Sequence, residues 1–350
     1  MDSTDIAPSS PSAAGLSTLR FRDRRGHPHS FNKKKKPSIS SAPKSTHDCR
    51  RRDRGGDTFS STPPRPPASF SDLPFDVLAR VAAPFDVPNL WAASMVCRAW
   101  RESLRPLREA MILLRWGKRF RHGHGGVRPN PQRALEYFLK GAALGSAPAM
   151  VDAGVMYGEM GEKEKAMALY EKAAEVGHPV GQSNLGTCYL EADLPEKAVT
   201  WFRQAAESGY ARAQYNLALC LHRGRGVECN LQDAAKWYLK AAEGGNIRAM
   251  YNTSLCYSLG EGKPRNIPRA RMWLKLAADC GHKKAQFEHG LELFISGNMI
   301  KALVYFELAK RAGETAASNM RDLILQSLSQ TSRDCAMLSV DKWRPLQFHH

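Results

Sequence analysis

The chain has 350 residues, of which 43% are hydrophobic, and a formal net charge of +17. This length allows two folded regions or one long array with tails, and the apolar content is sufficient for a core. The charge is uneven, because residues 1–68 hold 14 Lys and Arg against 6 Asp and Glu, whereas residues 129–350 hold 27 against 23. The later region is nearly balanced, which argues against a specific nucleic-acid-binding surface, since that needs a clustered basic face.

Residues 1–68 are rich in Ser, Pro, Lys and Arg and nearly free of large apolar residues. Such a segment cannot bury enough surface to offset its ordering entropy, so we expect it to be disordered. Its basic clusters are Lys33, Lys34, Lys35 and Lys36, and Arg50, Arg51 and Arg52. They are either possible import signals or a solvated charged tail. The polar start MDSTDIAPSS has no apolar secretory core, so we expect a nuclear and/or cytoplasmic protein.

Residues 69–115 contain two short amphipathic segments that differ from the rest of the chain. Leu73-Pro74 is suited to open a first helix, because proline is tolerated in the first turn. Pro84 and Pro88 interrupt the chain. Asn89 is then expected to cap a second helix. Its apolar stripe is Leu90, Ala93, Val96, Cys97 and Trp100.

The stretches LPFDVL (73–78) and VCRAWR (96–101) resemble the F-box, a module of about forty residues. The resemblance implies binding of the Skp adaptor of cullin-based ubiquitin ligases. It divides eight residues between internal packing and adaptor contact: Leu73, Pro74, Leu78, Val81, Leu90, Val96, Cys97 and Trp100. The alternative is that these helices only cap the first end of the array that follows.

Six similar segments recur along residues 116–325, each ending in a glycine. The glycines are Gly145, Gly177, Gly209, Gly245, Gly281 and Gly313. Their spacing of 32 or 36 residues is typical of a helical repeat array. Eleven residues before each glycine stands an alanine, and seven before it a large apolar residue. This period predicts an amphipathic helix that ends in a left-handed glycine cap.

A second helix follows each glycine, so we predict an all-α superhelical solenoid of about six hairpins. Large residues on one helix are expected to fill the space left by Ala and Gly on a neighbour. The loops GRGVECN (224–230) and GEGKPRN (260–266) are predicted to be turns, because no Gly-Lys-Ser/Thr follows their Gly-x-Gly. Asn130, Asn230 and Asn266 are suited to helix starts.

The repeated pattern Ala-x-x-Trp/Tyr-Tyr-x-x-Ala-Ala-x-x-Gly resembles the Sel-like repeat, which is related to the tetratricopeptide repeat. The family's usual role as a scaffold for protein partners is what the resemblance implies here. The last unit departs from the pattern at Arg321 and Asp322, which suits a polar terminal cap.

No set of nucleophile, base and orienting group is recognisable, so we expect a non-catalytic protein with no cofactor and no metal. Cys188, Cys220 and Cys256 recur at one repeat position, which favours small buried side chains over disulfides. The least polar stretch, residues 142–160, is explained by repeat helices, so no membrane span is expected. His178 and His282 follow repeat glycines and are expected in loops or at helix starts.

The tail at residues 326–350 is more apolar than a free tail, so it either folds back on the last repeat or offers a binding motif. The primary hypothesis is a substrate-recruiting subunit of an SCF-type ubiquitin ligase, which binds a Skp adaptor and cullin complex through the F-box and a protein substrate through the repeats. The alternatives are a scaffold without ubiquitination and, third, a nucleic-acid-associated protein using its basic front.

Overall fold

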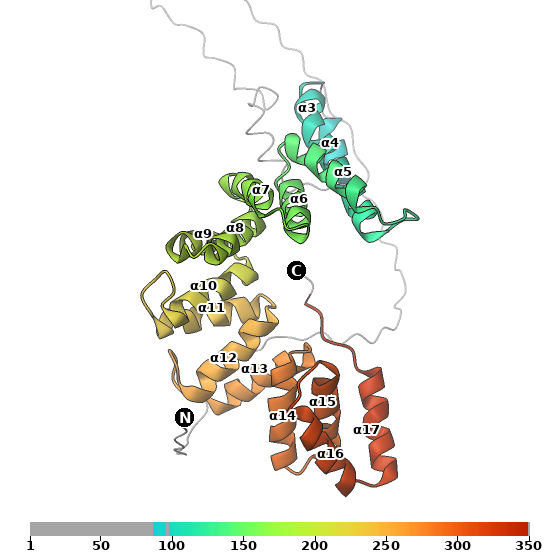
Figure 1. The fold of residues 1–350 in the computed structure, drawn as a ribbon, viewed down its shortest axis with the longest axis vertical. Helices are drawn as coiled ribbons and strands as arrows, with labels where there is room; N and C mark the ends of the chain where they lie inside the picture. The colour runs from blue at the N-terminus through green and yellow to red at the C-terminus, as the bar shows by residue number, and fades with distance from the viewer. Residues whose placement is uncertain (1–86, 96–97, 349–350) are drawn as a thin grey trace, which may run out of the picture. The chain divides into compact units, whose positions relative to one another are not determined.

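The computed structural model describes residues 87–95 and 98–348, and every regular element within these ranges is an α-helix (Figure 1). The expected disordered segment and its basic clusters therefore lie outside the described residues. The same holds for six residues of the F-box motif: Leu73, Pro74, Leu78, Val81, Val96 and Cys97.

The front helices are α2 (Val87–Ser94) and α3 (Arg98–Ser103). Asn89 lies inside the first turn of α2 and does not cap it, so that expectation was wrong. Pro88 does not interrupt the helix either. Proline has no backbone N–H, and the first turn of a helix does not use one. The predicted apolar stripe is also divided, with Leu90 on α2 and Trp100 on α3.

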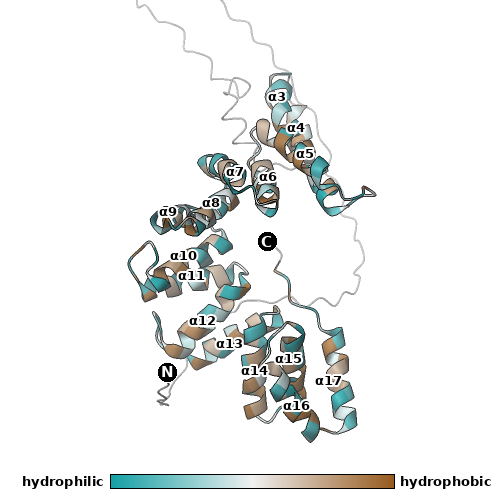
Figure 2. Ribbon diagram, viewed as in Figure 1, coloured by the Kyte–Doolittle hydropathy of each residue, from teal (hydrophilic) through white to brown (hydrophobic). Residues whose placement is uncertain are grey.

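The array follows as antiparallel helices, most of them 13 residues long. They are α4 (Arg105–His122), α5 (Pro131–Ala143), α6 (Ala147–Glu159), α7 (Lys163–Glu175), α8 (Pro179–Glu191), α9 (Pro195–Glu207), α10 (Ala211–Arg223), α11 (Leu231–Glu243), α12 (Ile247–Leu259), α13 (Ile267–Asp279), α14 (Lys283–Ile295), α15 (Met299–Arg311) and α16 (Ala317–Ser327). Consecutive helices pack side by side (Figure 1), and brown and teal segments alternate along them as amphipathic helices require (Figure 2).

The helix ends show why the glycines recur. All six repeat glycines have φ between 78° and 92°, in the left-handed region that suits glycine. At the end of α5, the N–H of Gly145 donates to Ala142 O and that of Ser146 to Gly141 O, which satisfies two helix carbonyls. At the other end of the helices, Asn130, Asn230 and Asn266 each accept a backbone N–H, so their predicted place at helix starts is confirmed.

Four of the close helix pairs contain a glycine that leaves room for an aromatic ring of the partner helix. An added Cβ would lie 2.6 Å from Tyr170 at Gly154 and 2.8 Å from Phe202 at Gly186. The same arrangement joins Gly117 to Phe138 and Gly290 to Phe306. These contacts pair α4 with α5, α6 with α7, α8 with α9 and α14 with α15, more closely than the helices on either side of the repeat glycines. The predicted hairpin joined the two helices on either side of a repeat glycine. The tight hairpin instead joins the helix after one repeat glycine to the helix before the next.

Because α4 pairs with α5, the array begins inside α4, which runs across residue 115. The turns inside two tight hairpins, α10 with α11 and α12 with α13, also need glycine. Gly226 approaches the backbone of Pro195, and Gly262 approaches that of Leu231, so neither site has room for a Cβ. These Gly-x-Gly segments are turns that wedge against the preceding repeat.

The C-terminal end folds back on the array, which is the first of the two arrangements expected for the tail. Helix α17 (Gln330–Lys342) packs against α15 and buries Ala336 and Val340. The side chain of Glu307 is only 9% exposed and accepts hydrogen bonds from Arg311 (3.1 Å) and Arg321 (2.6 Å). Arg321 thus fits the polar end of the array.

Among the described helices, none is both long enough and apolar enough to cross a bilayer.

Candidate functional site

Helix α2 has one buried face and one exposed apolar face. Leu90 and Ala93 are buried with Leu104 at the start of α4, and Trp100 packs against them. On the other side, the side chains of Trp91 and Met95 are 52% and 66% exposed. An exposed pair of large apolar residues, one on α2 and one directly after its end at Ser94, is a candidate contact surface for a protein.

Of the eight residues expected at the adaptor contact, the structure describes Leu90 and Trp100, and both contribute to internal packing. Trp91 and Met95 were not predicted. Both lie outside the stripe that starts at Leu90, so a helical projection of residues 87–95 could have found them. Arg108 lies over the Trp91 ring at 4.9 Å, which holds the indole in place while leaving half of it accessible.

A second recurring feature is a cation–aromatic pair at the connecting turn of the hairpins. A basic side chain from the first turn of one helix lies over a ring at the end of the preceding helix. The pairs are Arg133 with Phe120 (5.7 Å), Lys165 with Tyr157 (5.6 Å), Lys197 with Tyr189 (5.6 Å) and Arg269 with Tyr257 (5.7 Å). All four basic residues are exposed, so the same contacts present charge to solvent.

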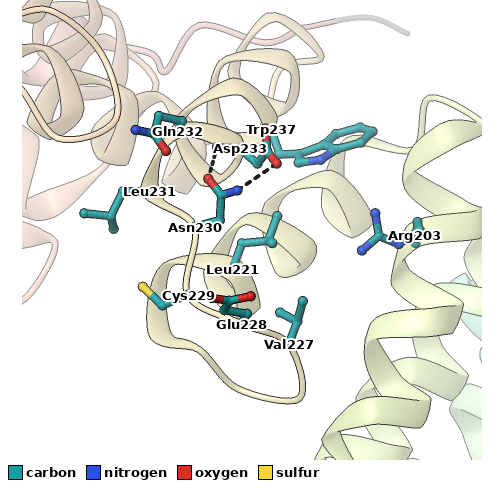
Figure 3. A pocket seen from close by; sticks show the side chains of 10 residues that line it. All are labelled: Arg203, Leu221, Val227, Glu228, Cys229, Asn230, Leu231, Gln232, Asp233 and Trp237. Carbon is teal, nitrogen blue, oxygen red and sulfur yellow. Dashed lines mark hydrogen bonds between the residues drawn. The ribbon is translucent and has the colours of Figure 1, made fainter.

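The hairpin of α10 and α11 lacks this pair and has a pocket instead. Leu221 takes the ring position and Asp233 takes the cation position, so both the bulk and the positive charge are missing. The pocket has a volume of about 640 Å³ (Figure 3). Its apolar lining is Leu221, Val227 and Trp237, and its charged lining includes Arg203 of the neighbouring helix α9.

The charged side chains of this pocket differ in whether they have hydrogen-bond partners. Asp233 is satisfied, because its carboxylate accepts hydrogen bonds from Asn230 Nδ2 (3.0 Å) and Lys236 Nζ (2.8 Å). Arg203 and Glu228 are exposed and make no hydrogen bond or ion pair with another described residue. Figure 3 shows Arg203 facing the loop residues from α9. The pocket therefore combines a few apolar side chains with a mostly polar lining and one unused charge of each sign, which suits a polypeptide side chain.

The histidines and cysteines of the array serve its packing. His178 and His282 cap α8 and α14, where their Nδ1 atoms accept the N–H of Gly181 and Ala285, so they stand at helix starts as expected. Burial lowers the pKa of both imidazoles, which keeps Nδ1 free to accept.

Burial also raises the pKa of the Cys256 thiol to about 11, which makes it a poor nucleophile. Cys220 and Cys256 are buried free thiols, in keeping with their expected role as small core residues, whereas Cys188, at the same repeat position, is a free thiol that is only partly buried. Within residues 87–95 and 98–348, no three His, Cys, Asp or Glu side chains are grouped to hold a metal.

Comparison with known families matches both parts of the chain. The F-box domain model matches residues 70–108. The Sel1 repeat model matches residues 113–146, 147–178, 179–210, 211–246, 247–282 and 285–314. These units start within α4 or at the helix after a repeat glycine, so they follow the tight hairpins of the structure. Both families are in general non-catalytic protein-interaction modules.

The chain is also similar to named proteins. It is 54% identical over 292 residues to the Arabidopsis thaliana F-box protein At1g70590, covering 81% of this chain and 83% of the relative. A Sel1 repeat protein from Oxalobacter formigenes is 26% identical, with a TM-score of 0.52 over 64% of this chain and 94% of its own. The Escherichia coli protein c5321, with an SLR fold, is 20% identical with a TM-score of 0.44 and covers 77% of this chain and 71% of its own.

Proposed function

Because the chain belongs to the F-box proteins that carry Sel1 repeats, we propose that it recruits substrates to an SCF-type ubiquitin ligase. In this role residues 70–108 bind a Skp-type adaptor, which connects to a cullin, and the repeats bind a protein substrate. The observation that carries the proposal is the presence of two separate contact surfaces on one chain: the exposed face of Trp91 and Met95, and the pocket between α9 and α11.

Such a subunit needs no catalytic residue of its own. By holding the substrate beside the transferring enzyme, it converts a bimolecular encounter into an intramolecular one, with an effective concentration on the order of millimolar for a short flexible connection. The rate gain therefore depends on both surfaces being occupied at once.

The pocket at Arg203 and Trp237 supports substrate binding by the array. Its apolar residues, Trp237 among them, are suited to contact the apolar part of a side chain, and the unpaired Arg203 is suited to a neighbouring carboxylate. Trp237 is half-buried and lies under Lys240 at 4.3 Å, so its ring is held in a fixed position. A rigid indole beside a pocket is a common anchor in protein interfaces.

The function is tested by expressing three tagged chains in cells: the intact chain, one lacking residues 70–108, and one carrying Trp237→Ala. The proposal expects a protein that the intact chain captures in ubiquitinated form and that the deleted chain captures unmodified. Capture should weaken with Trp237→Ala, whereas Trp116→Ala, which changes a half-exposed ring outside the pocket, should leave it unchanged.

Captured proteins that are never ubiquitinated, and whose lifetime is the same with and without residues 70–108, would favour the alternative function of a scaffold that assembles a complex. We also propose that the protein works in the nucleus and/or cytoplasm, from the two basic clusters in residues 1–68. Replacing both clusters with alanine tests the nuclear part, because an unchanged distribution rules them out as import signals.

A further inference from the structure

The last described residues form an extended segment that returns to the array. After α17 ends at Lys342, the N–H of Leu346 donates a hydrogen bond to Asp279 O, at 3.0 Å. Trp343 and Pro345 lie over Gly281: a Cβ built there would be 3.5 Å from Trp343 Cη2 and 3.9 Å from Pro345 Cβ. The segment thus contacts the turn between α13 and α14, well before it in the sequence.

This turn has the groups that an extended peptide needs. Asp279 is the last residue of α13, where carbonyls have no partner within the helix and remain free to accept an N–H. Gly281 has no side chain, so an aromatic ring can lie against its backbone. At four equivalent glycines of other repeats an added Cβ would have nothing within 4 Å; these are Gly145, Gly177, Gly209 and Gly313. The C-terminal segment therefore covers one of six similar positions.

Residues 343–348 make few contacts with the array, whereas helix α17, which precedes them, is well packed. The side chains of Leu346 and Phe348 remain 49% and 37% exposed. Helix α17 is fixed by buried Ala336 and Val340 and by the ion pair of Asp341 with Arg311, at 3.0 Å. A weak contact at the end of a firm anchor opens at little cost, as peripheral segments with few buried groups do.

We propose that residues 343–348 are an intramolecular ligand that covers a peptide-docking surface at Asp279 and Gly281. The surface fits an extended segment with an aromatic residue followed, three positions later, by an aliphatic residue whose N–H is free to donate. The segment must leave before a partner of this chemistry can bind. This inference rests on the proposed protein-binding role of the repeats, but docking of the segment can be measured without any adaptor or substrate.

The test uses a fluorescein-labelled peptide of residues 341–350 and two chains, one intact and one ending at Lys342. The shortened chain keeps every described helix. We expect the peptide to bind the shortened chain, and to bind the intact chain at least about tenfold more weakly. The reason is that the tethered copy competes at an effective concentration on the order of millimolar. A peptide with Leu346→Pro, which lacks the donor, should lose binding. Gln347→Pro is the matched control, since no described residue accepts the Gln347 N–H.

A second pair of variants tests the surface itself in the shortened chain. Gly281→Asn should remove peptide binding by filling the place of the Trp343 ring. Gly209→Asn, where nothing lies within 4 Å of an added Cβ, should not, although its backbone has the same left-handed conformation, with φ of 87° against 92°. Asparagine is chosen because it tolerates this region better than most residues.

Three results would overturn the proposal: no binding to the shortened chain at millimolar peptide, equal binding to both chains, or equal loss with both proline peptides. Because none of these measurements involves an adaptor, their failure would leave the proposed ligase role intact, and failure of that role would leave these results standing.

Discussion

Replacing Gly186 with alanine should destabilise the array, although alanine favours a helix. The new Cβ would lie 2.8 Å and 2.9 Å from two ring carbons of Phe202, which is fully buried, and 3.2 Å from Ala198 O. Overpacking of this kind costs about 1–3 kcal/mol, and the better helix propensity offsets about 1 kcal/mol of it. We therefore expect the free energy of unfolding to fall by roughly 1 kcal/mol.

The matched control is Gly158→Ala, in the last turn of α6, where an added Cβ has nothing within 4 Å. Here only the backbone effect operates, so the free energy of unfolding should rise by up to about 1 kcal/mol. Equilibrium urea unfolding of both variants, followed by circular dichroism, checks whether the signs are opposite. Adding Phe202→Leu to Gly186→Ala should recover part of the loss. If Gly186→Ala stabilises the chain as much as Gly158→Ala does, the space at Gly186 does not limit the packing.

Three further predictions concern hydrogen bonds made by polar side chains of the array. Glu307→Gln weakens the hydrogen bonds from Arg321 (2.6 Å) and a second arginine, and should lower the free energy of unfolding by about 1.5–3 kcal/mol; an unchanged melting temperature would contradict this. His178 and His282 have lowered pKa values when folded, so the unfolded chain binds more protons. Stability is therefore complete above about pH 6.5 and falls as the pH drops below it. Urea midpoints across pH should show this loss, and His178→Asn, which can cap without titrating, should reduce it. Asn266→Ala removes the cap of α13 and should cost about 1 kcal/mol, so an equal urea midpoint would speak against the cap.

The helices of the array could be predicted because their signals are local and occur six times. Gly145 and its equivalents end helices through a backbone conformation that depends on one residue type. Asn130 and Asn266 start helices through a side chain that reaches three residues along the chain. Repetition makes such signals readable without knowledge of the fold.

Which two consecutive helices form each tight hairpin was harder to predict from the sequence, because it depends on contacts between helices. Both helices beside a given one are amphipathic, and the fit of side chains between helices, such as that of the Phe202 ring against Gly186, decides which neighbour lies closer. The interruption between α2 and α3 was missed for a similar reason: the apolar spacing of Leu90 and Trp100 fits one helix as well as two.

The candidate surfaces follow even less directly from the sequence. The pocket beside Trp237 arises where Leu221 and Asp233 replace a pair that other hairpins have, so its signal is a departure from a pattern that only the structure makes visible. The fold-back of the tail could be expected from its apolar residues. The place where Leu346 binds could not, because Asp279 offers a backbone carbonyl, which every residue has.

The central claim is that the F-box binds a Skp-type adaptor, and direct binding to the purified adaptor tests it most simply. The account predicts that the intact chain binds and that Trp91→Ala weakens binding about tenfold or more, as the loss of an interface anchor does, with unchanged helicity. Trp237→Ala, in the array, should bind as the intact chain does. If the intact chain binds no adaptor paralogue, residues 70–108 only cap the array, and the protein is a scaffold outside the ligase machinery.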